Sequence, residues 1–292
     1  MKDNMVPRAK ERACDKAIKK TLAYSAVFKY PMSFHQLGTM LISKKRFDYE
    51  TFDRSLKRLL KKKRISTSKG KYYLKSVKPV SWEKRDKDSQ WLIKNNLRAI
   101  KILEIIPWLK MAAITGSVAA NNAERNADID LFIITQKNRL WITRGFATLV
   151  LSLIGKYAVG QNNKDKLCCN IFIDEKNLRW PREDNNIFVA HDILAMHPII
   201  NKDNIYFKFL RANKWVLKYF GHYKVELLAH PSSSKKGNWI GNYFDNAAMK
   251  AQLNYMKKKK TTEITKKGFL HFNTHDHTQN ILNNYKNLIG NI

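Results

Sequence analysis

Two carboxylates separated by a single apolar residue are the strongest chemical signal in the sequence. Asp128 and Asp130 flank Ile129 in an apolar run that favours a β-strand. Residues two apart on a strand point to the same face, so the two carboxylates are expected side by side. Such a pair is unfavourable unless a cation lies between them, and Mg²⁺ prefers carboxylate and phosphate oxygens. The pair predicts a metal site, with a solvated edge strand as the alternative.

A glycine–serine pair lies a short distance upstream of these acids. Residues 111–115 are expected to form a buried strand that leads into Gly116 and Ser117, and ten residues then separate Ser117 from Asp128. Glycine lets a phosphate approach the backbone closely. Ser117 is expected either to cap a short helix that follows or to contact a phosphate. The order of these residues therefore predicts phosphates on one side of the site and a metal on the other.

The two motifs together resemble the nucleotidyltransferase superfamily named after DNA polymerase β. Its pattern is hydrophobic–Gly–(Gly/Ser), a spacer of similar length, then Asp/Glu–hydrophobic–Asp/Glu–hydrophobic. Here the two halves read Ile114-Thr115-Gly116-Ser117 and Asp128-Ile129-Asp130-Leu131. The resemblance covers residues 88–180 and implies an α/β (α+β) fold, with a mixed sheet flanked by helices. It also implies transfer of a nucleoside monophosphate from an NTP to a hydroxyl, with Mg²⁺ or Mn²⁺ as cofactor.

The resemblance also implies roles for individual residues. Asp128 and Asp130 would be catalytic metal ligands, while Gly116 and Ser117 would hold the triphosphate. Arg125 would either meet a phosphate or remain a surface residue. The acceptor hydroxyl could belong to a small molecule, to a protein side chain or to the end of an RNA.

A third carboxylate, which the superfamily carries on a later strand, has no clear equivalent. On the strand expected at residues 167–174, the corresponding position is Asn170, which can ligate a metal weakly but cannot take up a proton. Asp174 lies four residues later on the same expected face and is the catalytic alternative; a residue elsewhere in the chain is the third choice. Cys168 and Cys169 on this strand are expected to point to opposite faces.

The first 80 residues predict a separate domain. Three helices, the second capped by Ser33, are followed by a β-hairpin, which is the outline of a winged helix-turn-helix. Its third helix, at residues 49–62, and the hairpin tip are basic, so the domain is expected to contact DNA or RNA. The alternative is a face that is solvated or docks onto protein. The expected nucleic-acid contacts are Arg54, Lys57, Arg58, Lys61, Lys69 and Lys71.

Charge supports a polyanionic partner. The chain of 292 residues has 55 Lys and Arg against 24 Asp and Glu, a net charge of +31. Abundant Lys and Asn throughout are also what compositional drift would give. Drift alone does not explain why residues 1–87 hold 25 basic against 8 acidic residues.

The remaining features set the expected class of protein. Residues 181–292 are expected to form a helical extension. The most apolar run, residues 146–159, is shorter than the roughly 20 residues of a membrane span, and three cysteines show no disulfide framework. We therefore expect a cytoplasmic protein with no membrane partner. The alternative function is a nucleic-acid-binding regulator, in which the transferase-like domain senses a nucleotide or is inactive.

Overall fold

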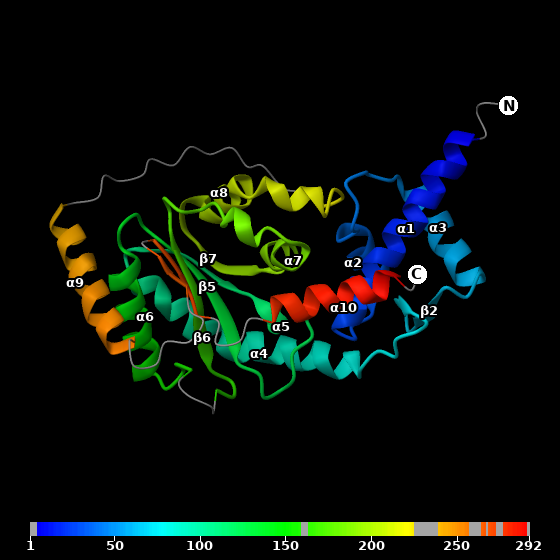
Figure 1. Cartoon of the computed structure of the whole chain (residues 1–292). Helices are drawn as coiled ribbons and strands as arrows, with labels where there is room; N and C mark the ends of the chain where they lie inside the picture. Colours follow the sequence, from blue (N-terminus) through cyan, green and yellow to red (C-terminus); the bar gives the residue numbers. More distant parts are fainter. Residues whose placement is uncertain are drawn as a thin grey trace.

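The computed structural model describes residues 5–158, 163–224, 239–256, 264–266, 268–272 and 277–290. These residues form a mixed α/β structure with a smaller N-terminal unit and a larger unit built on a six-stranded sheet (Figure 1). Among them, no helix has both the length and the apolar character needed to cross a bilayer.

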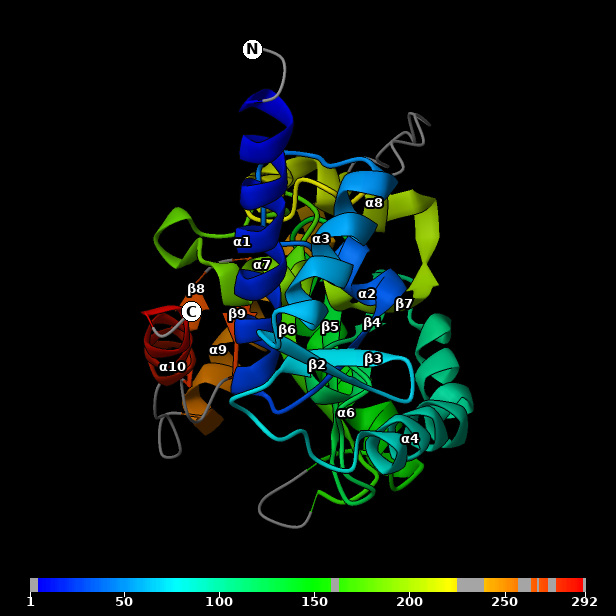
Figure 2. The ribbon, with the colours of Figure 1, turned by 90° about the vertical axis from the view of Figure 1, so that its right-hand side faces the viewer.

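The N-terminal unit has the element order helix, strand, two helices and two strands. Its three strands form an antiparallel sheet in the order β1-β3-β2 (Figure 2). Ser33 caps the second helix in a capping box with Gln36, as the sequence predicts, and Asp48 caps the third. The elements are α1 (Met5–Val27), β1 (Met32–Ser33), α2 (Phe34–Thr39), α3 (Tyr49–Lys61), β2 (Ile65–Ser68) and β3 (Lys71–Leu74).

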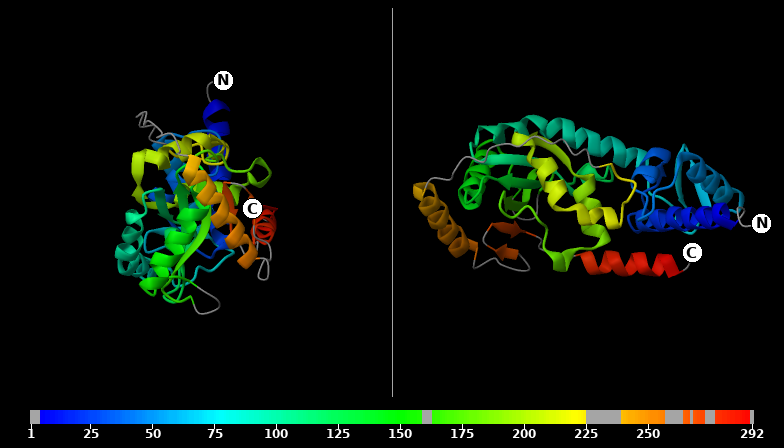
Figure 3. Two further views of the ribbon diagram at one scale, coloured as in Figure 1. Left: turned by 90° about the vertical axis from the view of Figure 1, so that its left-hand side faces the viewer. Right: turned by 90° about the horizontal axis from the view of Figure 1, so that it is seen from above.

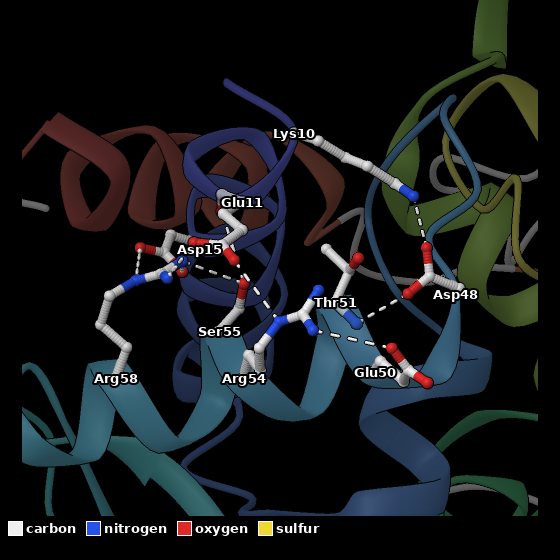
Figure 4. Close-up of polar contacts among 9 residues, drawn as sticks. All are labelled: Lys10, Glu11, Asp15, Asp48, Glu50, Thr51, Arg54, Ser55 and Arg58. Carbon is white, nitrogen blue, oxygen red and sulfur yellow. Dashed lines mark hydrogen bonds and ion pairs between the residues drawn. The ribbon is translucent and has the colours of Figure 1, made fainter. Parts of the chain in front are cut away.

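Helix α3 is fixed to α1 by an ion-pair network around Arg58 (Figure 4). The Arg58 guanidinium donates to both carboxylate oxygens of Asp15, at 3.0 and 2.7 Å, and to Glu11 at 2.6 Å. It also donates to the hydroxyl of the buried Ser55. Because Arg58 is bidentate and half-buried, it acts here as a packing residue between two helices.

The larger unit contains a sheet with the strand order β7-β4-β5-β6-β9-β8. Strands β5 and β6 are parallel, and every other neighbouring pair is antiparallel. Three of the six strands come from after residue 180, so the region expected to be a helical extension completes the sheet. The strands are β4 (Leu109–Ile114), β5 (Ile129–Thr135), β6 (Leu167–Asp174), β7 (His197–Asn201), β8 (Ile264–Lys266) and β9 (Phe269–His271).

Helices cover both faces of this sheet (Figure 1). Helices α4 and α6 pack on one face, against the apolar side chains of Ile129, Leu131 and Ile133. Helices α7 and α8 pack on the other face, against Phe132 and Ile134. The helices of this unit are α4 (Trp82–Ile102), α5 (Gly116–Ala119), α6 (Leu140–Leu153), α7 (Ile187–Ala195), α8 (Ile205–Ala212), α9 (Trp239–Met256) and α10 (Thr278–Gly290), with 3₁₀ turns at Leu103–Ile105, Arg182–Asp184, Lys202–Asn204 and Lys214–Lys218.

The two units share one hydrophobic core. Buried side chains of α1 belong to the same cluster as Phe132 of the large sheet, and α10 packs beside α1 (Figure 3). Polar contacts also cross the boundary: the Arg46 guanidinium donates to the carbonyl of Gly221 at 2.8 Å. The Asn122 amide donates to the carbonyl of Phe28 at 3.2 Å. The N-terminal unit is therefore packed against the sheet unit and is not a free appendage.

Replacing Arg58 tests its packing role. Arg58→Ala leaves the half-buried Asp15 without its partner and Glu11 with Arg54 alone, so we expect a loss of roughly 1–3 kcal/mol in the free energy of unfolding. Lys57→Ala removes the exposed cation of an ion pair with Asp53 and is expected to leave the free energy of unfolding nearly unchanged. Urea unfolding followed by circular dichroism measures both; equal losses would contradict the role given to Arg58.

Candidate functional site

The candidate site lies at one edge of the large sheet, where β4 ends and β5, β6 and β7 begin. The Thr115 amide, just after β4, donates to the carbonyl of Asp130 at 2.9 Å. Asp130 is paired with Cys168 across the parallel β5–β6 ladder, and Ile114 is paired with His197. The register therefore brings chemistry-bearing side chains from separate parts of the sequence to one edge.

Asp128, Asp130 and Cys168 form a compact, half-buried group. One carboxylate oxygen from each acid and the Cys168 sulfur all lie within 4.8 Å of one another, an arrangement that could hold a metal ion. The Cys168 side chain faces this group while Cys169 is buried in the core on the other face, as strand alternation predicts. The expected side-by-side placement of the two carboxylates is thus confirmed.

Burial and mutual repulsion perturb the acids. Burial, the charge of Asp128 and the charge of Asp192 raise the pKa of Asp130 to about 7, although a hydrogen bond from Asn170 opposes this. Burial also raises the pKa of Asp128. The pKa of the Cys168 thiol is raised by burial and by both carboxylates. A cation bound here would relieve the repulsion, because it favours the charged carboxylates.

Gly116 is in direct contact with Asp130. Its φ of +65° lies in the left-handed region, and a Cβ at this position would lie 2.7 Å from Oδ2 of Asp130. Both the backbone conformation and the closeness of the carboxylate therefore require glycine. The glycine loop and the acidic pair form one site, as the sequence predicts.

Ser117 differs in part from its expectation. Helix α5 begins at Gly116 with Thr115 at the N-cap position, so Ser117 lies within the helix and does not cap it. Its side chain is exposed and lines the cavity that contains Asp130. Ser117 is therefore placed to contact a ligand in the cavity, and it does not cap the helix.

Asn170 reaches the acidic pair because of a β-bulge. Leu131 pairs with Cys169 and Phe132 pairs with Ile171, so Asn170 is the extra residue on β6. Its amide nitrogen donates to Oδ1 of Asp130 at 3.3 Å. Its amide oxygen is buried and has no hydrogen-bond partner within the described part of the chain. A ligand or cation is the natural partner for that oxygen.

Asp174 does not join the site, which corrects the sequence-based expectation. It pairs with Thr135 at the opposite end of β6, about 20 Å along the strand from Cys168. The bulge at Asn170 also shifts the alternation, so Asp174 is on the opposite face of the sheet from Asp130. It is 3% exposed and accepts hydrogen bonds from the Asn138 and Lys176 amides and the Asn177 side chain. Asp174 is a structural residue at a strand end.

Asp130 and Asn170 open into a cavity of about 700 Å³ between the two units. Tyr24 of α1 and Phe28, just after this helix, form part of its wall, and Phe188 of α7 stacks on Phe28. Three cavity-lining side chains have a buried polar atom without a partner among the described residues: the Tyr24 hydroxyl, the Asn170 oxygen and the Trp180 indole nitrogen. Aromatic side chains make up much of the cavity wall, and Asp130 and Asn170 are among its polar groups.

Several residues at or near the acidic pair were not identified from the sequence. Cys168 enters through the parallel register with Asp130, and His197 through its pairing beside Ile114. Asp192 of α7 lines the cavity and acts on the charge of Asp130, although no spacing motif connects the two. Only the cross-strand and helix-on-sheet arrangement brings these residues together.

Arg125 and most of the predicted nucleic-acid contacts lie away from the acidic pair. The Arg125 guanidinium stacks 3.3 Å above the Trp91 ring on α4, which places it on the surface. In the N-terminal unit, Lys61 is exposed, while the other predicted contacts are in ion pairs: Arg54 with Glu11 and Glu50, Lys57 with Asp53, Arg58 with Glu11 and Asp15, Lys69 with Glu83, and Lys71 with Asp86.

Comparisons with models of known protein families and with curated proteins find no match to this chain.

A glycine substitution tests the contact with Asp130. Gly116→Ala must accept both the left-handed φ and a clash with the carboxylate, so we expect a loss of roughly 2–4 kcal/mol in the free energy of unfolding. Gly155→Ala is the matched control, because Gly155 has a φ of +68° with nothing within 4 Å of an added Cβ. The control should lose only about 1–2 kcal/mol. Identical losses in denaturant unfolding would contradict the close contact.

The raised pKa of Asp130 predicts a pH dependence of stability. The folded state keeps a proton on Asp130 that the unfolded state loses above about pH 4. Without divalent cations, the free energy of unfolding should therefore fall as the pH rises from about 4 to 7. Asp130→Asn should reduce this fall, and Asp203→Asn, at a surface ion pair, should not. Urea titrations in EDTA across this range give the measurement, and an unchanged slope in Asp130→Asn would refute the prediction.

Proposed function

We propose that the chain is a metal-dependent nucleotidyltransferase that transfers a nucleoside monophosphate from an NTP to a hydroxyl. One observation carries the proposal: the Gly116 backbone touches the Asp130 carboxylate, with Asp128 beside it, at the wall of a large cavity. A phosphate-accepting loop next to paired carboxylates is the arrangement that phosphoryl chemistry with Mg²⁺ requires. The mixed sheet flanked by helices is consistent with a polymerase β-like fold.

The donor set supports an oxygen-preferring cation. Asp128 and Asp130 would hold it, and rotation of the Asn170 amide would turn its unpartnered oxygen toward them. Mg²⁺ or Mn²⁺, when bound, supplies positive charge opposite the phosphates. Cys168 is the softer neighbour, and its raised pKa favours a protonated thiol that contributes little to such a site.

The cavity favours a small molecule as the acceptor. Its volume of about 700 Å³ lies within the range of small-molecule sites, and both units contribute to its wall. Gly116 and Ser117 would receive the phosphates at the edge of the same cavity.

A proton acceptor for the attacking hydroxyl has to come from outside β6. Asp192 on α7 lines the cavity and its charge contributes to the raised pKa of Asp130. We assign to Asp192 the role of general base, because Asn170 and Cys168 occupy the positions on β6 beside the acidic pair and neither is a carboxylate.

The presence of Asn170 and Cys168 beside the acidic pair favours a second function. A site that presents an amide and a thiol where the superfamily has a third acid would bind a nucleotide without turnover. The N-terminal unit has the element order of a winged helix, so the chain would then be a nucleic-acid-binding regulator with a nucleotide-sensing domain.

Incubation with Mg²⁺, labelled NTPs and a mixture of small hydroxyl compounds tests the first function. We expect pyrophosphate release and a labelled product, no activity in Asp130→Asn, and a loss of roughly 100-fold in Asp192→Asn. Arg125→Gln, whose guanidinium stacks on Trp91 and does not line the cavity, should keep full activity. Calorimetry with a non-hydrolysable NTP separates the alternatives: binding without turnover supports the sensor, and absence of both binding and turnover refutes both functions.

A further inference from the structure

The acidic residues of the N-terminal unit form ion pairs with a particular set of basic residues. Every acid that the structure describes between residues 5 and 87 forms an ion pair, and several of these pairs are visible in Figure 4. The acids and their partners are Glu11 with Arg54 and Arg58, Asp15 with Arg58, Asp48 with Lys10, Glu50 with Arg54, Asp53 with Lys57, Glu83 with Lys69, and Asp86 with Lys71.

Neutralisation therefore falls on five of the six residues expected to contact nucleic acid, all except Lys61. Arg54, Lys57 and Arg58 on α3 and Lys69 and Lys71 on the hairpin each face a carboxylate. A phosphate approaching this face would meet acids together with bases, and the counterion release that drives association with nucleic acid would be small. The positive charge of the unit must be concentrated elsewhere.

Part of it lies on a different surface, which we name the α1 basic face. Arg8, Arg12 and Lys16 follow one another at four-residue spacing on α1, so they share one side of the helix over about 12 Å. Lys61, Lys62, Lys63 and Arg64 follow at the end of α3. All seven are exposed, and none has an ion-pair partner in the part of the chain that is described.

A hollow of about 320 Å³ lies in the α1 basic face. Its lining residues are Arg12, Asp15, Lys16, Lys19, Leu59, Lys62 and Arg64. Five of these seven are cations that converge from α1 and from the end of α3. The single acid, Asp15, has both carboxylate oxygens bound by Arg58. The hollow is therefore an anion-attracting recess.

We propose that the α1 basic face binds the phosphate backbone of a nucleic acid, and that the α3 face does not. Closely spaced cations along a helix and around a recess match a ligand with closely spaced phosphates. A membrane surface fits less well, because interfacial helices bury an apolar face and the only apolar residue of the recess, Leu59, is 3% exposed. Lysine and arginine side chains that contact phosphates do not distinguish one base from another, so we expect this binding to be independent of nucleotide sequence.

The α1 basic face also shares no lining residue with the cavity of the candidate site. The cavity is lined by the C-terminal half of α1, from Thr21 onward, whereas the recess uses residues 12–19. The N-terminal end of α1 points away from the sheet unit (Figures 1 and 3). Binding at this face therefore does not depend on the proposed transferase, and each can fail without the other.

Two triple variants with the same change in net charge test the proposal in the full chain. Arg12→Gln/Lys16→Gln/Arg64→Gln alters the α1 basic face, and Arg54→Gln/Lys57→Gln/Lys69→Gln alters the exposed, paired cations. Fluorescence anisotropy against mixed-sequence duplex DNA, duplex RNA, single-stranded DNA and single-stranded RNA gives affinity as a function of salt. Circular dichroism checks that both variants fold.

For duplex DNA, we expect the first variant to lose at least tenfold in affinity at low salt. Its slope of log K against log salt should decrease by about 2.7, which is about 0.9 for each of three lost phosphate contacts. The second variant should keep the affinity within about twofold. Binding to all four nucleic-acid forms supports backbone recognition, and binding to one form identifies the source of the phosphates.

Three results would overturn the proposal. Equal losses in the two variants would show that only net charge matters. A larger loss in the second variant would return the contact to α3. Absence of nucleic-acid binding at low salt, including the case in which the chain binds only anionic phospholipid vesicles, would remove the proposed partner.

Discussion

The contact between the Gly116 backbone and the Asp130 carboxylate is the constraint on which the candidate site depends. It holds the end of β4 against the beginning of β5, since the Thr115 amide also bonds to the Asp130 carbonyl. The carboxylate lies beside Asp128 in spite of their repulsion, and burial together with the charges of Asp128 and Asp192 raises its pKa. Two carboxylates held together at a half-buried end of the sheet destabilise the fold by their repulsion, and a bound cation would relieve that repulsion.

The sequence was sufficient to predict the local parts of this site. Alternation along residues 128–131 placed the two carboxylates together, and the position of Gly116 after a short strand placed the loop beside them. These inferences succeeded because each depends on backbone geometry over a few residues. Asp174 was misplaced because a single bulged residue, Asn170, changes the phase of β6, and no residue type in that strand signals the bulge. Cys168 and Asp192 join the site only through tertiary contacts.

Charge on α3 shows a related limit. The helical pattern correctly aligned Arg54, Lys57, Arg58 and Lys61, but the acids that neutralise most of them lie partly on α1, more than 40 residues away in the chain for the Arg58 pairs. A basic stripe can be recognised from one helix alone, whereas its electrostatic field requires the neighbouring helix. The same holds for the expected helical extension after residue 180: its short strands find their place only by pairing with β4 and β6.

The continuous apolar cluster that spans both units has a consequence for how this chain can change over evolution. Tyr24, Phe28 and their neighbours are at once core residues of the small unit and wall residues of the cavity. Moving the first 80 residues onto another protein, or replacing them by a different module, would remove one wall of the cavity. It would also expose apolar surface on both parts of the chain. The two units are consequently expected to evolve together, because a substitution in one unit limits the substitutions that the other unit can accept.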